Sequence, residues 1–413
     1  MAKKKGKGGR TTPKGTRPLG AGKSGPWPVP DSVPVIGRGL APGFSNDEQL
    51  GLGAIAAGML DAARRELVGL ANAFDAELWA SGIWGASYGK ALIDADFEEV
   101  LADAYIAQAA GSVTPEGLAV LRVLAVVAPE PYATRAGRAA EELAATSTIR
   151  EPRWVDGLGA WEPTGVLMSF DPVDDDGVTY FVGFRGTGPH PGPEHSLAVY
   201  IDHNLKAVKD AFSAPSLAEV EPALARAARE EGVEFAPAPV GYAAAHILWA
   251  IDAADHIVNP VVSDEFRELR ALAMARCRAI VGPDPAPYVD DTPQLSPADR
   301  DALLGEFLAS PECADVTAGA DPDEVARLAS LIDWFANDYV LGVALRFSAV
   351  MVEIFCVDFV PRTFVGDAED LALLGQILRG WIRFVGRCRD LPPASIEPAL
   401  VAVDRWEPSL FPP

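Results

Sequence analysis

Apolar residues recur every three or four positions over most of the chain, which is the spacing of one face of an α-helix. In the first part of the chain this pattern covers residues 46–67, 114–127 and 133–145. Asn46 and Thr114 stand at N-cap positions before two of these stretches. About five helices in an antiparallel array are therefore expected between residues 46 and 148.

The same spacing returns further along the chain. It predicts a short helix over 204–212 and longer helices over 241–258, 263–281, 296–308, 321–340, 348–360 and 368–389. In the short helix Leu205, Val208 and Ala211 would share one face. Pro361 is expected to end the helix that precedes it.

Three short stretches have a different pattern, rich in aromatic and β-branched residues. They cover residues 165–171, 179–186 and 196–202, and Asp176-Gly177 between the first two is typical of a hairpin loop. These are the convincing strands of the chain, and turn residues separate them. The predicted fold class is mainly α with a small antiparallel β-meander (α+β), in which multi-helix arrays flank the strands.

Changes in pattern along the chain suggest four parts. Residues 1–45 are rich in Gly, Pro, Lys and Arg and are expected to form a disordered basic tail. A helical domain over 46–148 and a β-meander with following helices over 149–260 come next. Residues 261–413 are predicted to form a C-terminal helical domain.

Charge is distributed unevenly between the tail and the rest. Residues 1–45 hold nine basic side chains and one acidic side chain, a net charge of about +8. Since the net charge of the whole chain is −23, the residues beyond 45 carry about −31. A body this acidic repels nucleic acid and anionic membranes. The tail is either an arm that makes weak nucleic-acid contacts or a solubilising terminus.

The cysteine pattern and the distribution of apolar residues point to a cytoplasmic protein. The four cysteines, Cys277, Cys313, Cys356 and Cys388, form no CxxC pair, and three lie in apolar helical patterns, as buried free thiols do. No apolar segment follows the basic start, and no run of apolar residues is long enough to span a membrane. We therefore expect no secretory signal and no membrane association.

Several phrases in the chain resemble a bacterial protein family. They are "DAELWASGIWG" (75–85), "EPRWVDGLGAWEP" (151–163), "LAVYIDHNLKAVKDAF" (197–212), "LRFSAVMVEIFCVDFVPR" (345–362) and "WIRFVGR" (381–387). This set is similar to an uncharacterised, mainly actinobacterial protein family without assigned activity. The resemblance implies a shared fold over most of the chain beyond the tail, and it supplies no catalytic residues.

The stretch "HSLAVYIDHNLKAVKDAF" (195–212) is the place that most resembles an active site. Its functional interpretation uses His190, His195, Asp202 and His203 as metal ligands, or His203, Asp202 and His195 as catalytic groups, with Glu194 as a base. Neither HxH nor HExxH spacing occurs. The structural interpretation makes Asp202 or Asn204 the cap of the following helix and leaves His203 unexplained.

Other candidate sites have a plainer alternative beside them. The acidic loop 171–177 departs from EF-hand spacing and is expected to be a solvated hairpin turn. Asp252 and His256 share a helix face, with His246 on roughly the same side, and suit either half of a metal site or an ordinary helix surface. A winged-helix module over 95–186 would offer few cations to DNA.

The last long helix carries a row of arginines beside its apolar face. Arg379, Arg383 and Arg387 recur every fourth residue and are a candidate site for an anion or a carboxylate-bearing partner. The alternative is a set of ion pairs with the protein's own acidic residues.

Taken together, these patterns favour a non-catalytic binding or regulatory protein with a protein partner and no cofactor. Phosphate-binding glycine loops and nucleophile motifs are missing from the sequence. The partner is expected to meet the tail, the arginine row or the aromatic segment around Trp79 and Trp84. The alternative is a metal- or His/Asp-dependent enzyme acting on a small molecule at residues 190–203.

Overall fold

The computed structural model describes residues 46–86, 88, 96–257, 260–282, 288–289, 295–340 and 345–410. All of them belong to one compact unit that covers residues 37–413. The tail over residues 1–45 lies outside the described residues, so its predicted disorder and its nucleic-acid contact stay predictions.

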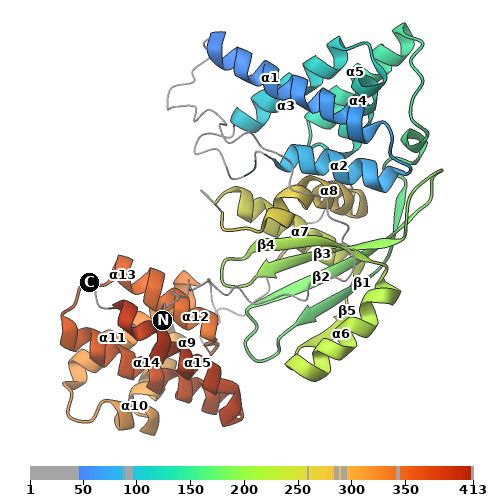
Figure 1. The fold of residues 1–413 in the computed structure, drawn as a ribbon. Helices are drawn as coiled ribbons and strands as arrows, with labels where there is room; N and C mark the ends of the chain where they lie inside the picture. The colour runs from blue at the N-terminus through green and yellow to red at the C-terminus, as the bar shows by residue number, and fades with distance from the viewer. Residues whose placement is uncertain are drawn as a thin grey trace, which may run out of the picture. The chain divides into compact units, whose positions relative to one another are not determined.

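The predicted fold class is confirmed, because the described chain is mainly helical with one antiparallel sheet (Figure 1). The helices before the sheet are α1 (Asn46–Ala62), continued by a π-helical turn (Ala63–Leu67), α2 (Ala73–Gly85), α3 (Asp96–Gly111), α4 (Pro115–Val127) and α5 (Tyr132–Thr146). A 3-10 turn (Arg153–Gly157) leads into the first strand. Thr114 is the N-cap of α4, where its side chain accepts a hydrogen bond from Gly117 N.

The sheet has five strands in the order β4-β3-β2-β1-β5. They are β1 (Trp161–Phe170), β2 (Gly177–Gly186), β3 (His195–Asp202), β4 (Ala207–Pro215) and β5 (Glu234–Pro237). The first four form a meander, and β5 pairs antiparallel with β1 at the other edge. The three predicted strands therefore correspond to β1, β2 and β3.

The predicted helix over 204–212 is wrong, because β4 occupies residues 207–215. A β-bulge explains the error. Val208 pairs with Ile201 and Ala211 with Val199, so Val208 and Ala211 reach the same face although they are three residues apart. That spacing of three imitates a helical stripe in the sequence.

Helices cover both faces of the sheet (Figure 1). On one face α6 (Leu217–Glu231) packs through Val220 and Leu224 against Phe181 and Ala198. On the other face lie α7 (Val240–Asp255) and α8 (Asp264–Val281). Strand β2 is consequently buried along most of its length, as a strand covered on both sides must be.

Helix α8 also packs closely against α2. A Cβ atom at Gly85 would lie 1.8 Å from the carbonyl oxygen of Arg267, so only glycine allows the two helices to approach here. The Ser81 hydroxyl accepts a hydrogen bond of 3.0 Å from Leu272 N at the same contact. Although the sequence placed α8 in the C-terminal helical domain, its contacts are with α2, α7 and β4.

The remaining helices form a second core further along the chain. They are α9 (Pro297–Leu308), α10 (Pro311–Val316), α11 (Pro322–Trp334), α12 (Ala349–Ile354), α13 (Val360–Thr363), α14 (Ala368–Cys388) and α15 (Pro393–Trp406), with π-helical turns at Phe335–Tyr339 and Phe355–Phe359 and a 3-10 turn at Glu407–Leu410. Fully buried Trp381 and Phe355 lie in this core. None of the helices in the described residues combines the length and apolar character needed to cross a membrane.

Candidate functional site

Asp202 is the last residue of β3, and His203 and Asn204 lie in the turn that leads to β4. Asp202 is 2% exposed, and its Oδ1 accepts hydrogen bonds from Asn204 N at 2.8 Å and Leu205 N at 3.2 Å. Its Oδ2 accepts a hydrogen bond of 3.1 Å from Lys209 Nζ. Asp202 therefore satisfies backbone amides as the capping interpretation expected, but it does so in a β-turn and not at the start of a helix.

A second turn, between β1 and β2, lies against this one. Asp171 Oδ1 accepts hydrogen bonds from Val173 N at 2.7 Å and Asp174 N at 3.0 Å, which shapes the turn. Asp176 Oδ1 accepts a hydrogen bond of 3.0 Å from Asn204 Nδ2 in the neighbouring turn. The carboxylates that the sequence suggested for a solvated hairpin loop are thus partly buried, with 17% of the Asp176 side chain exposed.

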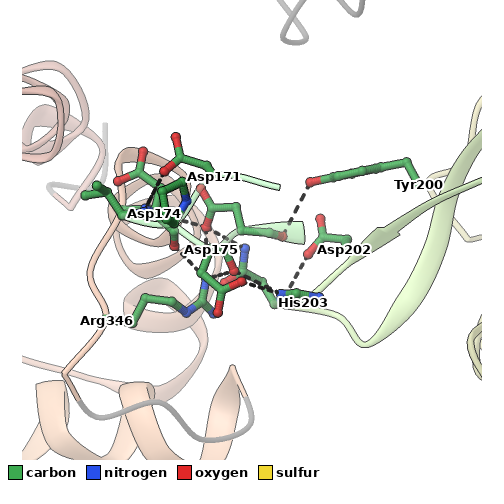
Figure 2. Close-up of polar contacts among 12 residues, drawn as sticks. Asp171, Asp174, Asp175, Tyr200, Asp202, His203 and Arg346 are labelled. Atoms are coloured by element: carbon green, nitrogen blue, oxygen red, sulfur yellow. Dashed lines mark hydrogen bonds and ion pairs between the residues drawn. The ribbon is translucent and has the colours of Figure 1, made fainter. Parts of the chain in front are cut away.

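Arg346, from the segment that leads into α12, connects both turns (Figure 2). Its NH1 group lies 3.0 Å from the carbonyl oxygen of Asp175 and 3.1 Å from Asp176 Oδ1, and its NH2 group donates to Asn204 Oδ1 at 2.7 Å. Ser348 Oγ donates a further bond of 2.6 Å to Asp176 Oδ1. We call Asp175, Asp176, Asn204, Arg346 and Ser348 the turn junction.

Arg389 holds the same hairpin turn from the end of α14. Its NH1 group donates to the carbonyl oxygen of Val173 at 2.8 Å, and its NH2 group donates to that of Pro172 at 3.3 Å. Arg346 and Arg389 therefore both bind the β1–β2 turn, and most of their acceptors are backbone carbonyls. Such bonds fix geometry whatever the protonation state of the nearby side chains.

His203, which the capping interpretation left unexplained, belongs to the edge of this junction (Figure 2). Its Nδ1 lies 3.0 Å from Asp175 Oδ1 and 3.1 Å from the Asp175 carbonyl oxygen. Its backbone amide donates to the Asp176 carbonyl oxygen at 2.9 Å. The imidazole is 30% exposed. These contacts give His203 a structural role in joining the two turns.

Burial perturbs the carboxyl groups of the β1–β2 turn. It raises the pKa of Asp174 to about 6, and the charges of Asp176 and Asp171 act in the same direction. Burial also raises the pKa of Asp176, against the hydrogen bonds from Asn204 and Ser348. The turn therefore contains a carboxyl group that titrates close to neutral pH.

His195 lies at the opposite end of β3, about 23 Å from Asp202 for seven residues of extended chain. Its ring is 2% exposed and stacks on Phe74 with 3.6 Å between ring centroids, while Trp161 meets it edge-on at 4.8 Å. Its Nδ1 lies 3.0 Å from the Pro193 carbonyl oxygen, so Nδ1 carries the proton. Burial lowers the pKa of this imidazole to about 4.

The loop before β3 is an ordered cap for helix α2. The carbonyl oxygens of His190 and Pro191 accept hydrogen bonds of 2.9 Å from Ala73 N and 3.0 Å from Phe74 N. Glu194, the proposed base, lies 3.3 Å from Arg185 in an exposed ion pair. The backbone of this loop thus satisfies amides of α2 that have no partner within the helix.

The metal or acid–base group of His190, His195, Asp202 and His203, which the sequence left open as an alternative, is not assembled. The described residues contain no group of three or more His, Cys, Asp or Glu side chains placed to hold a metal ion. The physical reason is that β3 runs straight between the two ends of the candidate stretch. His195 and His190 stay near α2, whereas Asp202 and His203 lie at the turn junction.

Sequence reasoning missed a buried ion pair near His195. Glu77 on α2 pairs with Arg276 on α8, and both side chains are almost fully buried. Glu77 Oε1 also accepts hydrogen bonds of 2.8 Å from Gly159 N and 3.1 Å from Trp161 Nε1. The available signal was a single glutamate inside the apolar run "DAELWASGIWG", since a buried carboxylate needs a cationic partner.

The candidate residues of α7 also separate. Asp252 and His256 form a pair of 3.7 Å in which both side chains are more than three-quarters exposed. His246 is buried instead, and its Nδ1 lies 3.0 Å from the hydroxyl of Tyr180 on β2. Asp252 and His256 therefore form a surface pair, whereas His246 is a core histidine, so the three residues do not form one site.

The arginine row of α14 is largely engaged with acidic residues of the protein itself. Arg379 pairs with Asp404 at 2.6 Å and with Glu407 at 2.9 Å, and Arg387 pairs with Glu312 at 2.6 Å. Arg383 is exposed. The ion-pair alternative thus accounts for two of the three guanidinium groups.

The aromatic segment of α2 is engaged in a similar way. Trp84 is 5% exposed and its Nε1 donates to Glu98, while Trp79 Nε1 donates to Glu66 at 3.1 Å.

Comparisons with known protein families, with curated proteins and with solved structures find no match to the chain. The resemblance to an actinobacterial family therefore stays a prediction.

Proposed function

We propose that this chain is a non-catalytic binding protein of the bacterial cytoplasm whose partner is a cationic protein. The observation that carries the proposal is that many arginines of the chain form ion pairs with its own carboxylates. Arginines that pair with carboxylates of the chain and are at most about a quarter exposed are Arg122, Arg267, Arg270, Arg276, Arg300, Arg346 and Arg379. Many acidic side chains beyond residue 45 are left without a cation to balance them.

A large net negative charge changes the rate at which the protein associates with a charged partner. Beyond residue 45 the chain carries about −31, from a total of −23 and about +8 in the tail. A surface of one sign raises the association rate of an oppositely charged protein and discriminates against nucleic acid. An enzyme at residues 190–203 is not proposed, because its candidate groups lie at opposite ends of β3.

Titration with peptides of opposite charge tests this function. The full-length protein is titrated with poly-arginine and with poly-glutamate at low and high ionic strength, and heats of binding are measured. Binding of poly-arginine that weakens with salt, with no binding of poly-glutamate, supports the proposal. Equal binding of both polymers, or binding of neither at low salt, contradicts it.

The tail is a separate proposal, in which residues 1–45 make weak contacts with nucleic acid. Replacing Lys3, Lys4, Lys5 and Lys7 by glutamine in the full-length protein should remove any salt-sensitive association with double-stranded RNA. RNA binding that survives these four changes unaltered would contradict a role for the tail.

A further inference from the structure

An aromatic surface on α7 stands out among the described residues. Tyr242, His246 and Trp249 are spaced by four and three residues, so their side chains lie on one face of the helix. The ring of Tyr288 packs on this face, stacked on His246 with 4.2 Å between centroids and 5.2 Å from Trp249. We call Tyr242, His246, Trp249 and Tyr288 the aromatic face.

The aromatic face is partly open to solvent and fixed from below. Tyr242 is 45% exposed, and Trp249 and Tyr288 are half-buried. Beneath them His246 is held by its contact of 3.0 Å with the Tyr180 hydroxyl. The orientation of the outer rings is therefore set before any ligand arrives, which lowers the entropy cost of binding.

The charges around these rings favour a cation. Helix α7 contains no lysine or arginine, and its acidic residues are Asp252 and Asp255. Asp255 is paired with Arg270, whereas the Asp252 side chain, which lies 3.7 Å from His256, is 76% exposed and one turn beyond Trp249. The carboxyl end of the helix dipole adds negative potential at the same end. The Trp249 end of the aromatic face therefore lies in a field that attracts cationic groups.

The geometry of the rings selects among cations. Neighbouring centroids are 5.6 Å apart for Tyr242 and Tyr288, so the rings touch one another and leave no gap that would enclose a tetrahedral ammonium group. A planar guanidinium group can lie flat on such a surface. The chain already uses this contact internally, where the Arg276 guanidinium lies 4.1 Å from the centre of the Trp161 ring.

We propose that the aromatic face binds arginine side chains of an arginine-containing segment of the partner, an inference that rests on the proposed function. Tyr242 and Trp249 are seven residues apart on α7, a rise of about 10.5 Å. A segment in the polyproline II conformation has three residues per turn, so residues i and i+3 lie on the same side, about 9 Å apart. Such a segment with the pattern Arg-x-x-Arg would therefore place one guanidinium on each of these rings.

The test compares short Gly/Ser peptides that carry arginine or lysine at every third position, by calorimetric titration of the full-length protein. The arginine peptide should bind several-fold more tightly than the lysine peptide. Tyr242→Ala should weaken the arginine peptide about threefold to fivefold, and Tyr242→Phe, which keeps the ring, should retain its affinity. Trp334→Ala is the matched control, since Trp334 on α11 is 42% exposed.

The outcomes separate this inference from the proposed function. Arginine-peptide binding that is unchanged in both Tyr242→Ala and Trp249→Leu overturns the aromatic face and leaves the cationic partner standing. Equal affinity for the two peptides in the unaltered protein overturns the inference as well. Failure of both peptides to bind at low salt overturns the proposed function itself.

Discussion

The Arg346 guanidinium and the Asp176 carboxylate form an ion pair of 3.1 Å between residues 170 positions apart in the sequence. Arg346 is 3% exposed and Asp176 17% exposed. The pair joins the segment before α12 to the β1–β2 turn. Because one guanidinium serves a carboxylate, two carbonyl groups and Asn204, its loss leaves several polar groups without partners at once.

Replacement of Arg346 by methionine should therefore destabilise the protein strongly. Removing one partner of a buried ion pair costs about 3–5 kcal/mol, because the remaining charge stays buried without compensation. The free energy of unfolding, measured by urea denaturation, checks this value. Arg362→Met is the control, since Arg362 is 71% exposed in its pair with Asp358 and should change stability by less than about 1 kcal/mol. Equal small losses in both variants would contradict the buried role of Arg346.

Asp174 should make stability fall as the pH rises toward neutrality. Burial raises its pKa from 3.8 to about 6, so the folded protein holds this proton more tightly than the unfolded chain does. The resulting stabilisation is complete below about pH 4 and is lost as the pH rises through 6. In urea denaturation between pH 4 and 8, Asp174→Asn should be more stable than the unaltered protein at pH 7, and the difference should disappear near pH 4. Parallel curves for the two proteins would show that Asp174 titrates normally.

Local sequence patterns were sufficient for most of the fold. Alternation over residues 196–202 indicated β3, and the cap Thr114 marked a real helix start, because these features depend on neighbouring residues alone. Strand β4 was missed because Lys209 is the extra residue of a bulge, which changes the side-chain period from two to three. A bulge is set by the partner strand and leaves no local signal.

The candidate site was less accessible from sequence. His203 was identified as unusual, but its partner Asp175 lies 28 residues away, and Arg346 is 142 residues away from Asn204. No periodicity connects residues at such separations. Single charged residues inside apolar runs, Glu77 and Arg346, were the usable signal, because each must find a polar partner when its segment is buried.

His195 should remain neutral at pH values where an ordinary histidine is protonated. Burial lowers its pKa from 6.5 to about 4, so the unfolded chain takes up a proton that the folded protein refuses. Its contribution to stability is therefore lost progressively as the pH falls from about 6.5 toward 4. NMR titration of the imidazole nitrogens measures this directly. Exposed His256, whose pKa is raised by its hydrogen bond to the Asp252 carbonyl oxygen and by the Asp252 charge, is the internal control. Titration of His195 near 6.5 would mean that its ring is not buried.

Asp202 and His203 should differ sharply when each is replaced. Asp202→Ala leaves two backbone amides and the Lys209 ammonium without their acceptor, in a position that is 2% exposed. Unsatisfied buried groups of this kind cost about 1–3 kcal/mol each, so a loss of a few kcal/mol is expected in urea denaturation. His203→Asn removes contacts of a ring that is 30% exposed, and the expected loss is below about 1 kcal/mol. Asp202→Asn, which keeps the oxygen that accepts the amides, should recover much of the stability lost in Asp202→Ala. A larger loss of stability in His203→Asn than in Asp202→Ala would contradict this prediction. It would mean that the β3–β4 turn depends more on the imidazole of His203 than on the carboxylate of Asp202.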